Sequence, residues 1–190
     1  MFDTDNLEHS RKYVPIIKSE IERVLILLKD FLEIKKIKIE PDVMDINLLL
    51  DEVVESFKPL IIDRKIEILY NNNDDELYIV ADYNRLKQVF VNMIKNSIEA
   101  LEGMPKGKIK IEVNESNKDI VIKIIDNGCG IDKETLKHMN EPFFTTKVYG
   151  TGLGVFLSRE IVKAHEGELK YISENNKTIT MIILPKKKGY

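Results

Sequence analysis

The sequence of 190 residues predicts an α+β fold: a two-layer α/β sandwich whose mixed, mostly antiparallel sheet is covered on one face by helices. Two observations predict it. Short segments with the alternating pattern of strands are interspersed with longer segments that have the periodicity of amphipathic helices. Segments 108–113 and 120–125 both alternate and are separated only by 114–119, which is typical of two antiparallel strands.

One helix is predicted ahead of the sandwich, from Tyr13 to about Ile37. Its apolar residues form one wide stripe, so it needs a partner helix and is a possible homodimer contact. Pro41 ends this helix, and we interpret 35–42 as a linker. We therefore expect two parts, a helical part at 1–40 and a larger domain at 41–190. The stripe consists of Ile17, Ile21, Val24, Leu25, Leu28, Phe31 and Leu32.

Within the larger domain, a helix is expected at 45–63, with Asn47 as its N-cap. Asp82 caps a second long helix that ends near Glu102. The other expected elements are strands at 66–70 and 77–80 around a turn at 71–75, a helical turn at 133–138, a helix at 154–165, and final strands at 168–173 and 178–184.

The composition excludes several classes of function. The formal net charge is −3 and 43% of the residues are hydrophobic, so nothing indicates nucleic-acid binding. Cys129 is the sole cysteine, which excludes an intrachain disulfide and a cysteine zinc cluster. No apolar run is long enough to span a membrane, and residues 1–10 are too polar for a signal peptide. We expect a cytoplasmic location and no membrane contact within this sequence.

Two asparagines on the helix at 82–102 are the first candidate functional residues. Asn92 and Asn96 lie one helical turn apart, so both amides point to the same place. Asn is a poor helix former, costing about 0.6 kcal/mol per interior position relative to Ala. Its carbonyl oxygen is a hard ligand that suits Mg²⁺. The alternative is an ordinary solvated face, which also contains Arg85, Gln88, Lys95 and Glu99.

The second candidate is Asp126-Asn127-Gly128-Cys129-Gly130, which follows an apolar strand. A carboxylate at this place can accept a hydrogen bond from an exocyclic amine, and the glycines let the backbone approach a flat ring. The alternative is a simple turn, because Asp, Asn and Gly are common turn residues.

The third candidate is a glycine-rich loop, Gly150-Thr151-Gly152-Leu153-Gly154, directly before the last predicted helix. Such a loop presents backbone N–H groups and the positive end of a helix dipole, which bind phosphate. Lys147 precedes the loop and can add a positive charge. The spacing of the glycines is neither that of a Walker A loop nor that of a dinucleotide fingerprint.

Taken in order, these segments resemble the sequence boxes of bacterial sensor histidine kinases. The resemblance extends over about residues 45–185, and it implies the ATP-binding sandwich that these kinases share with gyrase, MutL-type repair proteins and heat-shock chaperones. The matching segments are 92–100 (N box), 126–130 (G1 box), Glu141-Pro142-Phe143-Phe144-Thr145-Thr146-Lys147 (F box) and 150–154 (G2 box).

The resemblance implies that the domain binds ATP and Mg²⁺. Asp126 would hold the adenine amine, with Thr178 nearby, and Asn96 would be a ligand of Mg²⁺. Asn92 and Lys147 are the implied catalytic residues. Asn92 stands where hydrolysing relatives carry a Glu, so transfer should be favoured over hydrolysis. Residues 143–154 would form a mobile lid, as short as in nitrogen- and sporulation-type kinases. The implied cofactor-binding residues are Asn92, Lys95, Asn96, Asp126, Gly128, Gly130, Ile131, Lys147, Gly150, Thr151, Gly152, Leu153, Gly154 and Thr178.

The sequence departs from the family pattern in two places. Only Thr178 remains of the Gly-x-Gly-Thr turn that many relatives have before the last strand. The acceptor box, roughly His-Glu-x-x-x-Pro, is absent, because His9 is followed by Ser10 and the helix at 13–37 resembles the second helix of a dimerisation hairpin. His138 and His165 are expected at the surface.

The activity implied by the resemblance is that of a histidine protein kinase. The γ-phosphoryl group of ATP would be transferred to a histidine on the dimerisation hairpin of the same kinase, and then to the receiver domain of a response regulator. This chain alone is expected not to autophosphorylate, because it lacks the acceptor histidine. Two alternatives stay open: an anti-sigma-type serine kinase of the same fold, and a non-catalytic ATP-sensing regulatory module.

Overall fold

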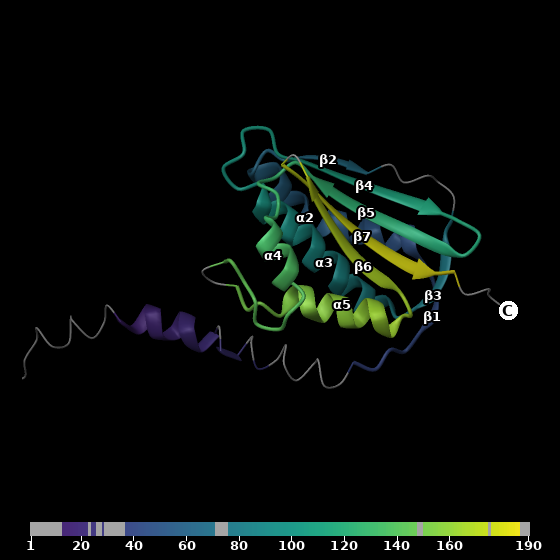
Figure 1. Cartoon of the computed structure of the whole chain (residues 1–190), viewed down its shortest axis with the longest axis horizontal. Coiled ribbons are helices and arrows are strands. Elements are labelled where there is room, and N and C mark those ends of the chain that lie inside the picture. Colours follow the sequence, from purple (N-terminus) through teal and green to yellow (C-terminus); the bar gives the residue numbers. More distant parts are fainter. Residues whose placement is uncertain are drawn as a thin grey trace, which may run out of the picture.

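The computed structural model describes residues 13–22, 24–25, 28, 37–70, 76–147, 150–174 and 176–186. Residues 13–22 are helical, and this helix stands apart from the sandwich in Figure 1. Its apolar side chains, such as Ile17 and Ile21, are more than half exposed. The predictions for His9, for the end of this helix and for the turn at 71–75 lie outside the described residues. Among the helices of the described part, none combines the length and the hydrophobicity needed to cross a membrane.

The main sheet is mixed and mostly antiparallel, as the sequence predicts (Figure 1). Its strands are Glu67–Tyr70 (β2), Lys108–Glu115 (β4), Asp119–Asp126 (β5), Glu168–Glu174 (β6) and Lys177–Pro185 (β7). Their order is β2-β4-β5-β7-β6, and β2 runs parallel to β4 while the other neighbours pair antiparallel. Alternate side chains of β5 are buried, which is the pattern of a sheet with one covered face.

A two-stranded sheet joins β1 (Asp42–Asp45) to β3 (Tyr78–Ala81). The pairing is antiparallel, and the buried side chains of Met44 and Ile79 lie on opposite strands of this pair. The predicted linker includes Asp42, which already belongs to β1, so that boundary is wrong. The strands predicted at 66–70 and 77–80 are confirmed, but they enter different sheets and form no hairpin. Alternation identifies a strand and does not identify its partner.

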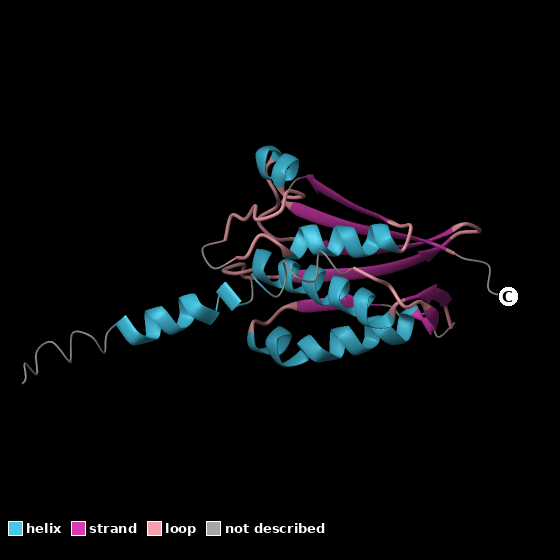
Figure 2. Ribbon diagram, turned by 90° about the horizontal axis from the view of Figure 1, so that it is seen from below, coloured by secondary structure: helices cyan, strands magenta, loops and turns pink. Residues whose placement is uncertain are grey.

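Helices α2 (Ile46–Asp63), α3 (Tyr83–Ala100) and α5 (Gly154–Ala164) form a layer over one face of the main sheet (Figure 2). α3 packs against both α2 and α5 and also contacts β5. The apolar side of α3 is buried, with Leu86 and Phe90 at 0% exposure. Burial of each such side chain contributes about 1.5–3 kcal/mol. The short α4 (Lys133–His138) leads into the segment that contains Lys147.

The start of α2 differs from the prediction. Asp45, not Asn47, is the N-cap, and its Oδ1 accepts a hydrogen bond of 2.9 Å from the Asn47 N–H. Because β1 runs directly into the helix, Asp45 has an extended backbone and its carboxylate reaches back to the first turn. For α3 the predicted N-cap is confirmed, since Asp82 Oδ1 accepts from the N–H of Arg85 at 3.1 Å.

The predicted surface position of His165 is wrong. His165 ends α5 and is only 5% exposed. Its Nε2 accepts a hydrogen bond of 2.9 Å from the backbone N–H of Asp82, and its Nδ1 lies 2.8 Å from the carbonyl oxygen of Ile161 and donates to it. The Asp82 carboxylate also accepts from the N–H of Glu40 at 2.9 Å. Asp82 and His165 thus join the segment before β1 to the start of α3 and the end of α5.

Candidate functional site

The two candidate asparagines extend from α3 to different partners. Nδ2 of Asn92 donates to Oγ of Ser158 on α5 at 3.0 Å. Oδ1 of Asn96 accepts a hydrogen bond of 2.7 Å from Nζ of Lys147. The spacing of one helical turn therefore brings both amides to the border between α5 and the loop that contains Lys147.

Lys147 is held on α3 by two acceptors. Its ammonium pairs with the carboxylate of Glu99 as well as with Asn96. The ammonium is a cation placed directly at Oδ1 of Asn96, so this position accepts positive charge. Lys95 lies 3.9 Å from Glu99, and its side chain is 62% exposed. No group of three or more His, Cys, Asp or Glu side chains within the described ranges can hold a metal ion. A Mg²⁺ ion at Asn96 would therefore take most of its ligands from phosphate and water, which is its usual manner of binding.

Asp126 is the last residue of β5, and its carboxylate is buried, with 3% exposure. Its Oδ2 accepts from the hydroxyl of Ser97 at 3.0 Å, and its Oδ1 accepts from the N–H of Gly128 at 3.1 Å. Burial raises the pKa of Asp126 above its usual value, and these two hydrogen bonds offset only part of the effect. A carboxylate has more acceptor sites than these two donors use, so it can accept from a further amine.

The residues expected around adenine gather at the same end of the sheet. Thr178 of β7 lies directly opposite Asp126 in the strand register and is also buried. Ser173 pairs with Thr178 from β6, and its Oγ accepts from the N–H of Ile131 at 2.7 Å. Gly130, with φ +77°, makes the bend that brings the chain to Ser173. The structure thus brings together residues that are far apart in the sequence.

The glycine-rich loop folds back onto the F-box segment. The N–H of Phe143 donates to the carbonyl of Gly152 at 3.0 Å. Gly152 has φ +68°, and a Cβ at this position would lie 2.3 Å from the carbonyl carbon of Phe143. Gly150 donates to the carbonyl of Lys147 at 3.2 Å. The loop therefore contacts the backbone of both Phe143 and Lys147.

The N-terminus of α5 has no side-chain cap, which distinguishes it from the other helices of the sandwich in the described part of the chain. Leu153 is its N-cap, is fully buried, and makes no side-chain capping hydrogen bond. In the described part of the chain, α2, α3 and α4 are instead each capped by an aspartate. Because the first N–H groups of a helix have no intrahelical partner, the start of α5 at Gly154 offers donors and a positive dipole end to an anion.

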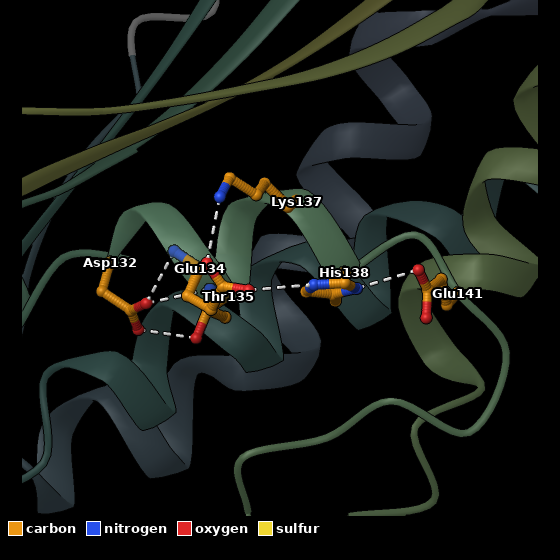
Figure 3. Close-up of polar contacts among 6 residues, drawn as sticks. All are labelled: Asp132, Glu134, Thr135, Lys137, His138 and Glu141. Carbon is orange, nitrogen blue, oxygen red and sulfur yellow. Dashed lines mark hydrogen bonds and ion pairs between the residues drawn. The ribbon is translucent and has the colours of Figure 1, made fainter.

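His138 lies at the end of α4 and is engaged by two carboxylates (Figure 3). Its Nδ1 is 2.9 Å from Glu141 and its Nε2 is 3.1 Å from Glu134. The hydrogen bond to Glu141, followed by that to Glu134, raises the pKa of His138. The Phe144 ring packs beside the imidazole, with 5.8 Å between the centroids. His138 therefore ties α4 to the F-box segment, in the partly exposed position that the sequence predicts.

Sequence reasoning missed several polar side chains of this region. Ser97 and Ser158 are not among the predicted site residues, yet Ser97 donates to Asp126 and Ser158 accepts from Asn92. A single small polar residue within an otherwise apolar stripe was the available signal. Glu99 was part of a presumed solvated face, and nothing in the sequence pairs it with Lys147.

Comparison with known proteins agrees with this arrangement. Residues 81–188 match the family described as histidine kinase-, DNA gyrase B-, and HSP90-like ATPase, and the chain belongs to this family. Sporulation kinase C of Bacillus subtilis (strain 168) is 38% identical over 181 residues, which are 93% of this chain and 42% of that protein. The chain therefore spans less than half the length of this curated relative.

Solved structures specify the type of domain. The catalytic domain of histidine kinase ThkA has a TM-score of 0.71 and 32% identity, and the match covers 77% of this chain and 96% of that chain. ThkA in complex with response regulator protein TrrA has a TM-score of 0.77 and 28% identity, covering 98% of this chain and 53% of that chain. The chain is a histidine kinase ATP-binding catalytic domain.

Proposed function

We propose that this domain transfers the γ-phosphoryl group of ATP to a histidine of a dimerisation hairpin, from which a response regulator receives it. The observation that carries the proposal is that Asn92 lies against Gly154 at the N-terminus of α5, while Asn96, one turn along α3, binds Lys147. These groups supply the donors and the positive charge that phosphoryl transfer requires. The similarity to Sporulation kinase C and to ThkA, which was solved with a response regulator, supports the proposal.

In this proposal α3 connects the two ends of the bound ATP. Adenine lies at the sheet end, where Asp126 accepts its amine, with Thr178 beside it and Gly128, Gly130 and Ile131 along the ring. The phosphates lie at the start of α5. The residues proposed to contact them are Asn92, Lys95, Asn96, Lys147, Gly150, Thr151, Gly152, Leu153 and Gly154.

Mg²⁺ is proposed to bind at Oδ1 of Asn96. The position fits a cation, because the ammonium of Lys147 occupies it with an oxygen distance of 2.7 Å. The amide oxygen is a hard donor and leaves the remaining positions to phosphate and water. Bound there, Mg²⁺ would neutralise charge on the phosphate oxygens. When ATP binds, the ammonium of Lys147 leaves Oδ1 of Asn96 and binds a phosphate oxygen instead. Its positive charge then stabilises the phosphate together with that of Mg²⁺.

The proposed reaction is an in-line displacement. A ring nitrogen of the acceptor histidine forms a bond with the γ-phosphorus while the bond to the bridging oxygen breaks, and ADP leaves with that electron pair. The proton on the other ring nitrogen passes to an acid-base group of the hairpin. Asn92 cannot take a proton from water as a carboxylate can, so the site favours transfer over hydrolysis.

The acceptor histidine is proposed to lie outside this sequence. The sequence has no His-Glu-x-x-x-Pro box, and we propose that residues 1–40 are the second helix of the hairpin and its linker, with 41–190 the catalytic domain. Two described histidines have both ring nitrogens engaged: His165 is buried, and His138 is bound by two carboxylates. The exposed apolar side of the helix at 13–22 supports its role as one partner of a hairpin, and of a homodimer.

The experiment that tests the proposed function combines binding with transfer. Calorimetry should show that the chain binds a non-hydrolysable ATP analogue more tightly with Mg²⁺ than without it. A separately supplied hairpin that carries a His-Glu-x-x-x-Pro box should then be phosphorylated on histidine. Binding without any transfer would favour an ATP-sensing module, and acid-stable label on a serine would favour a serine kinase.

A further inference from the structure

Ser158 is a buried polar side chain, and Asn92 is its one polar side-chain partner among the residues that the structure describes. It lies on the buried side of α5 with Leu157, Ile161 and Val162, and it is 2% exposed. Its Oγ accepts the hydrogen bond of 3.0 Å from Nδ2 of Asn92, which is the one hydrogen bond of that amide within the described part of the chain. A buried hydroxyl on an apolar helix face is costly unless it is bonded, so the pair is a specific feature.

Asn92 is confined against the first turns of α5. A Cβ at Gly154 would lie 2.7 Å from Oδ1 of Asn92 and 3.0 Å from its Nδ2, so the amide group rests directly on the Gly154 backbone. Ser158 holds the Nδ2 side of that amide one helical turn further along α5. No residue in the described ranges donates to Oδ1. The carbonyl oxygen of Asn92 is therefore the free end of the amide, beside the N-terminus of α5.

We propose that Ser158 is a positioning residue that holds the amide of Asn92 in place for phosphoryl transfer. This inference rests on the proposed function, because Asn92 matters only if the phosphates bind at the start of α5. The last torsion of an Asn side chain is broad, so without a partner the amide can rotate away from this position. A mobile Asn92 amide would lose the fixed geometry that the transition state requires, which lowers the rate more than it weakens ATP binding.

Loss of the Ser158 hydroxyl should change the rate of phosphoryl transfer more than the affinity for ATP. Ser158 is too deeply buried to contact ATP itself, and it acts through Asn92. Loss of one hydrogen bond is worth about a three- to tenfold change in an equilibrium or rate constant. We expect Ser158→Ala to lower the transfer rate to a separate hairpin by about that factor, while the dissociation constant for an ATP analogue changes less than about twofold.

Ser158→Cys separates the hydrogen bond from packing. Cys fills the volume of Ser and accepts hydrogen bonds weakly, so it should transfer as slowly as the Ala variant. If packing alone were the role of Ser158, Cys would restore the wild-type rate. Thermal unfolding and far-ultraviolet circular dichroism of each variant verify that it is folded, so that the transfer rates of folded proteins are compared.

A double-mutant cycle with Asn92 gives the decisive result. Because Ser158 acts through Asn92, Ser158→Ala should have no further effect on the rate in an Asn92→Ala background. Additive effects of the two substitutions, or an unchanged rate in Ser158→Ala, would overturn the proposal.

The side-chain amide resonances of Asn92 in NMR spectra provide a readout that needs no transfer. They should shift and exchange faster with solvent in Ser158→Ala, and unchanged resonances would contradict the proposal. If the wild-type chain transfers nothing to any hairpin, the proposed function fails while this NMR test still decides the contact.

Discussion

The Nζ of Lys147 donates to Oδ1 of Asn96 at 2.7 Å, although the two residues are 51 positions apart in the chain. The contact joins the loop of the F box to the helix of the N box, and Glu99 completes it by binding the same ammonium. A positive charge therefore sits at the amide oxygen that the family resemblance assigns to Mg²⁺. The proposed Mg²⁺ ion and the ammonium of Lys147 would therefore share one position on α3.

Asn96→Ala should remove most of the gain in ATP affinity that Mg²⁺ gives. The amide oxygen is the proposed protein ligand of the ion, and its loss should cost about tenfold in affinity, or roughly 1.4 kcal/mol. Calorimetric titration with an ATP analogue, with and without Mg²⁺, measures the difference. Asn114→Ala, the same change at an exposed position of β4, is the control. An Asn96→Ala protein that responds to Mg²⁺ as the parent does would exclude Asn96 as a ligand.

Asp126→Asn should weaken ATP binding at least tenfold without weakening the fold. The new amide can accept from Gly128 and donate to Ser97, so the protein contacts survive, but it places a donor near the adenine amine. The mismatch is worth about 1–3 kcal/mol. Asp119→Asn makes the same charge change at the other end of β5 and should leave affinity unaltered. Equal affinities of the Asp126 variant and the wild type, with both folded, would refute the adenine assignment.

The pH dependence of ATP binding follows from the raised pKa of Asp126, which burial causes. The ionised carboxylate accepts the adenine amine, so affinity should be constant above the raised pKa and fall as the pH drops through it. The decline should therefore begin at a higher pH than for an ordinary Asp. For stability the sign is opposite: the folded state binds this proton more tightly, so ionised Asp126 costs stability above that pKa and acidification relieves the cost. Titrations at several pH values should show the decline in the parent and not in Asp126→Asn.

His165→Phe should destabilise the fold and leave the chemistry of the site intact. The substitution leaves the backbone N–H of Asp82 and the carbonyl of Ile161 without their imidazole partner. An unsatisfied buried group costs about 1–3 kcal/mol, which urea unfolding detects as a lower midpoint. His138→Gln is the control, because exposed ion pairs contribute about 0–1 kcal/mol. Equal midpoints for the two variants would contradict the bridging role of His165.

The sequence was sufficient for the features that depend on local chemistry. Asp82 as a helix cap, the polar face with Asn92 and Asn96, and the strand that ends at Asp126 all follow from periodicity and residue type over a short window. The mixed sheet under a layer of helices follows from the order of those elements.

Features that depend on contacts between segments distant in the sequence could not be predicted from local patterns. From the sequence, His165 is predicted to be a surface residue at a helix end. Its burial depends on the tertiary fold, which places the start of α3 and the backbone N–H of Asp82 beside it. The pairing of β1 with β3 could not be predicted either, because the sequence pattern of a short strand does not indicate which other strand it pairs with. The contact of Ser158 with Asn92 requires the packing of α5 on α3, which sequence spacing within either helix does not contain.

The most direct test of the central claim uses radiolabelled ATP and Mg²⁺ with the chain alone and with a separate hairpin that carries a His-Glu-x-x-x-Pro box. Phosphohistidine is acid-labile and base-stable, so the chemistry of the label identifies the acceptor. We predict no stable label on the chain alone and acid-labile, base-stable label on the hairpin when both are present. Label that appears on the chain alone and is lost in His9→Gln, or a hairpin that stays unlabelled although the chain binds ATP, would contradict this prediction.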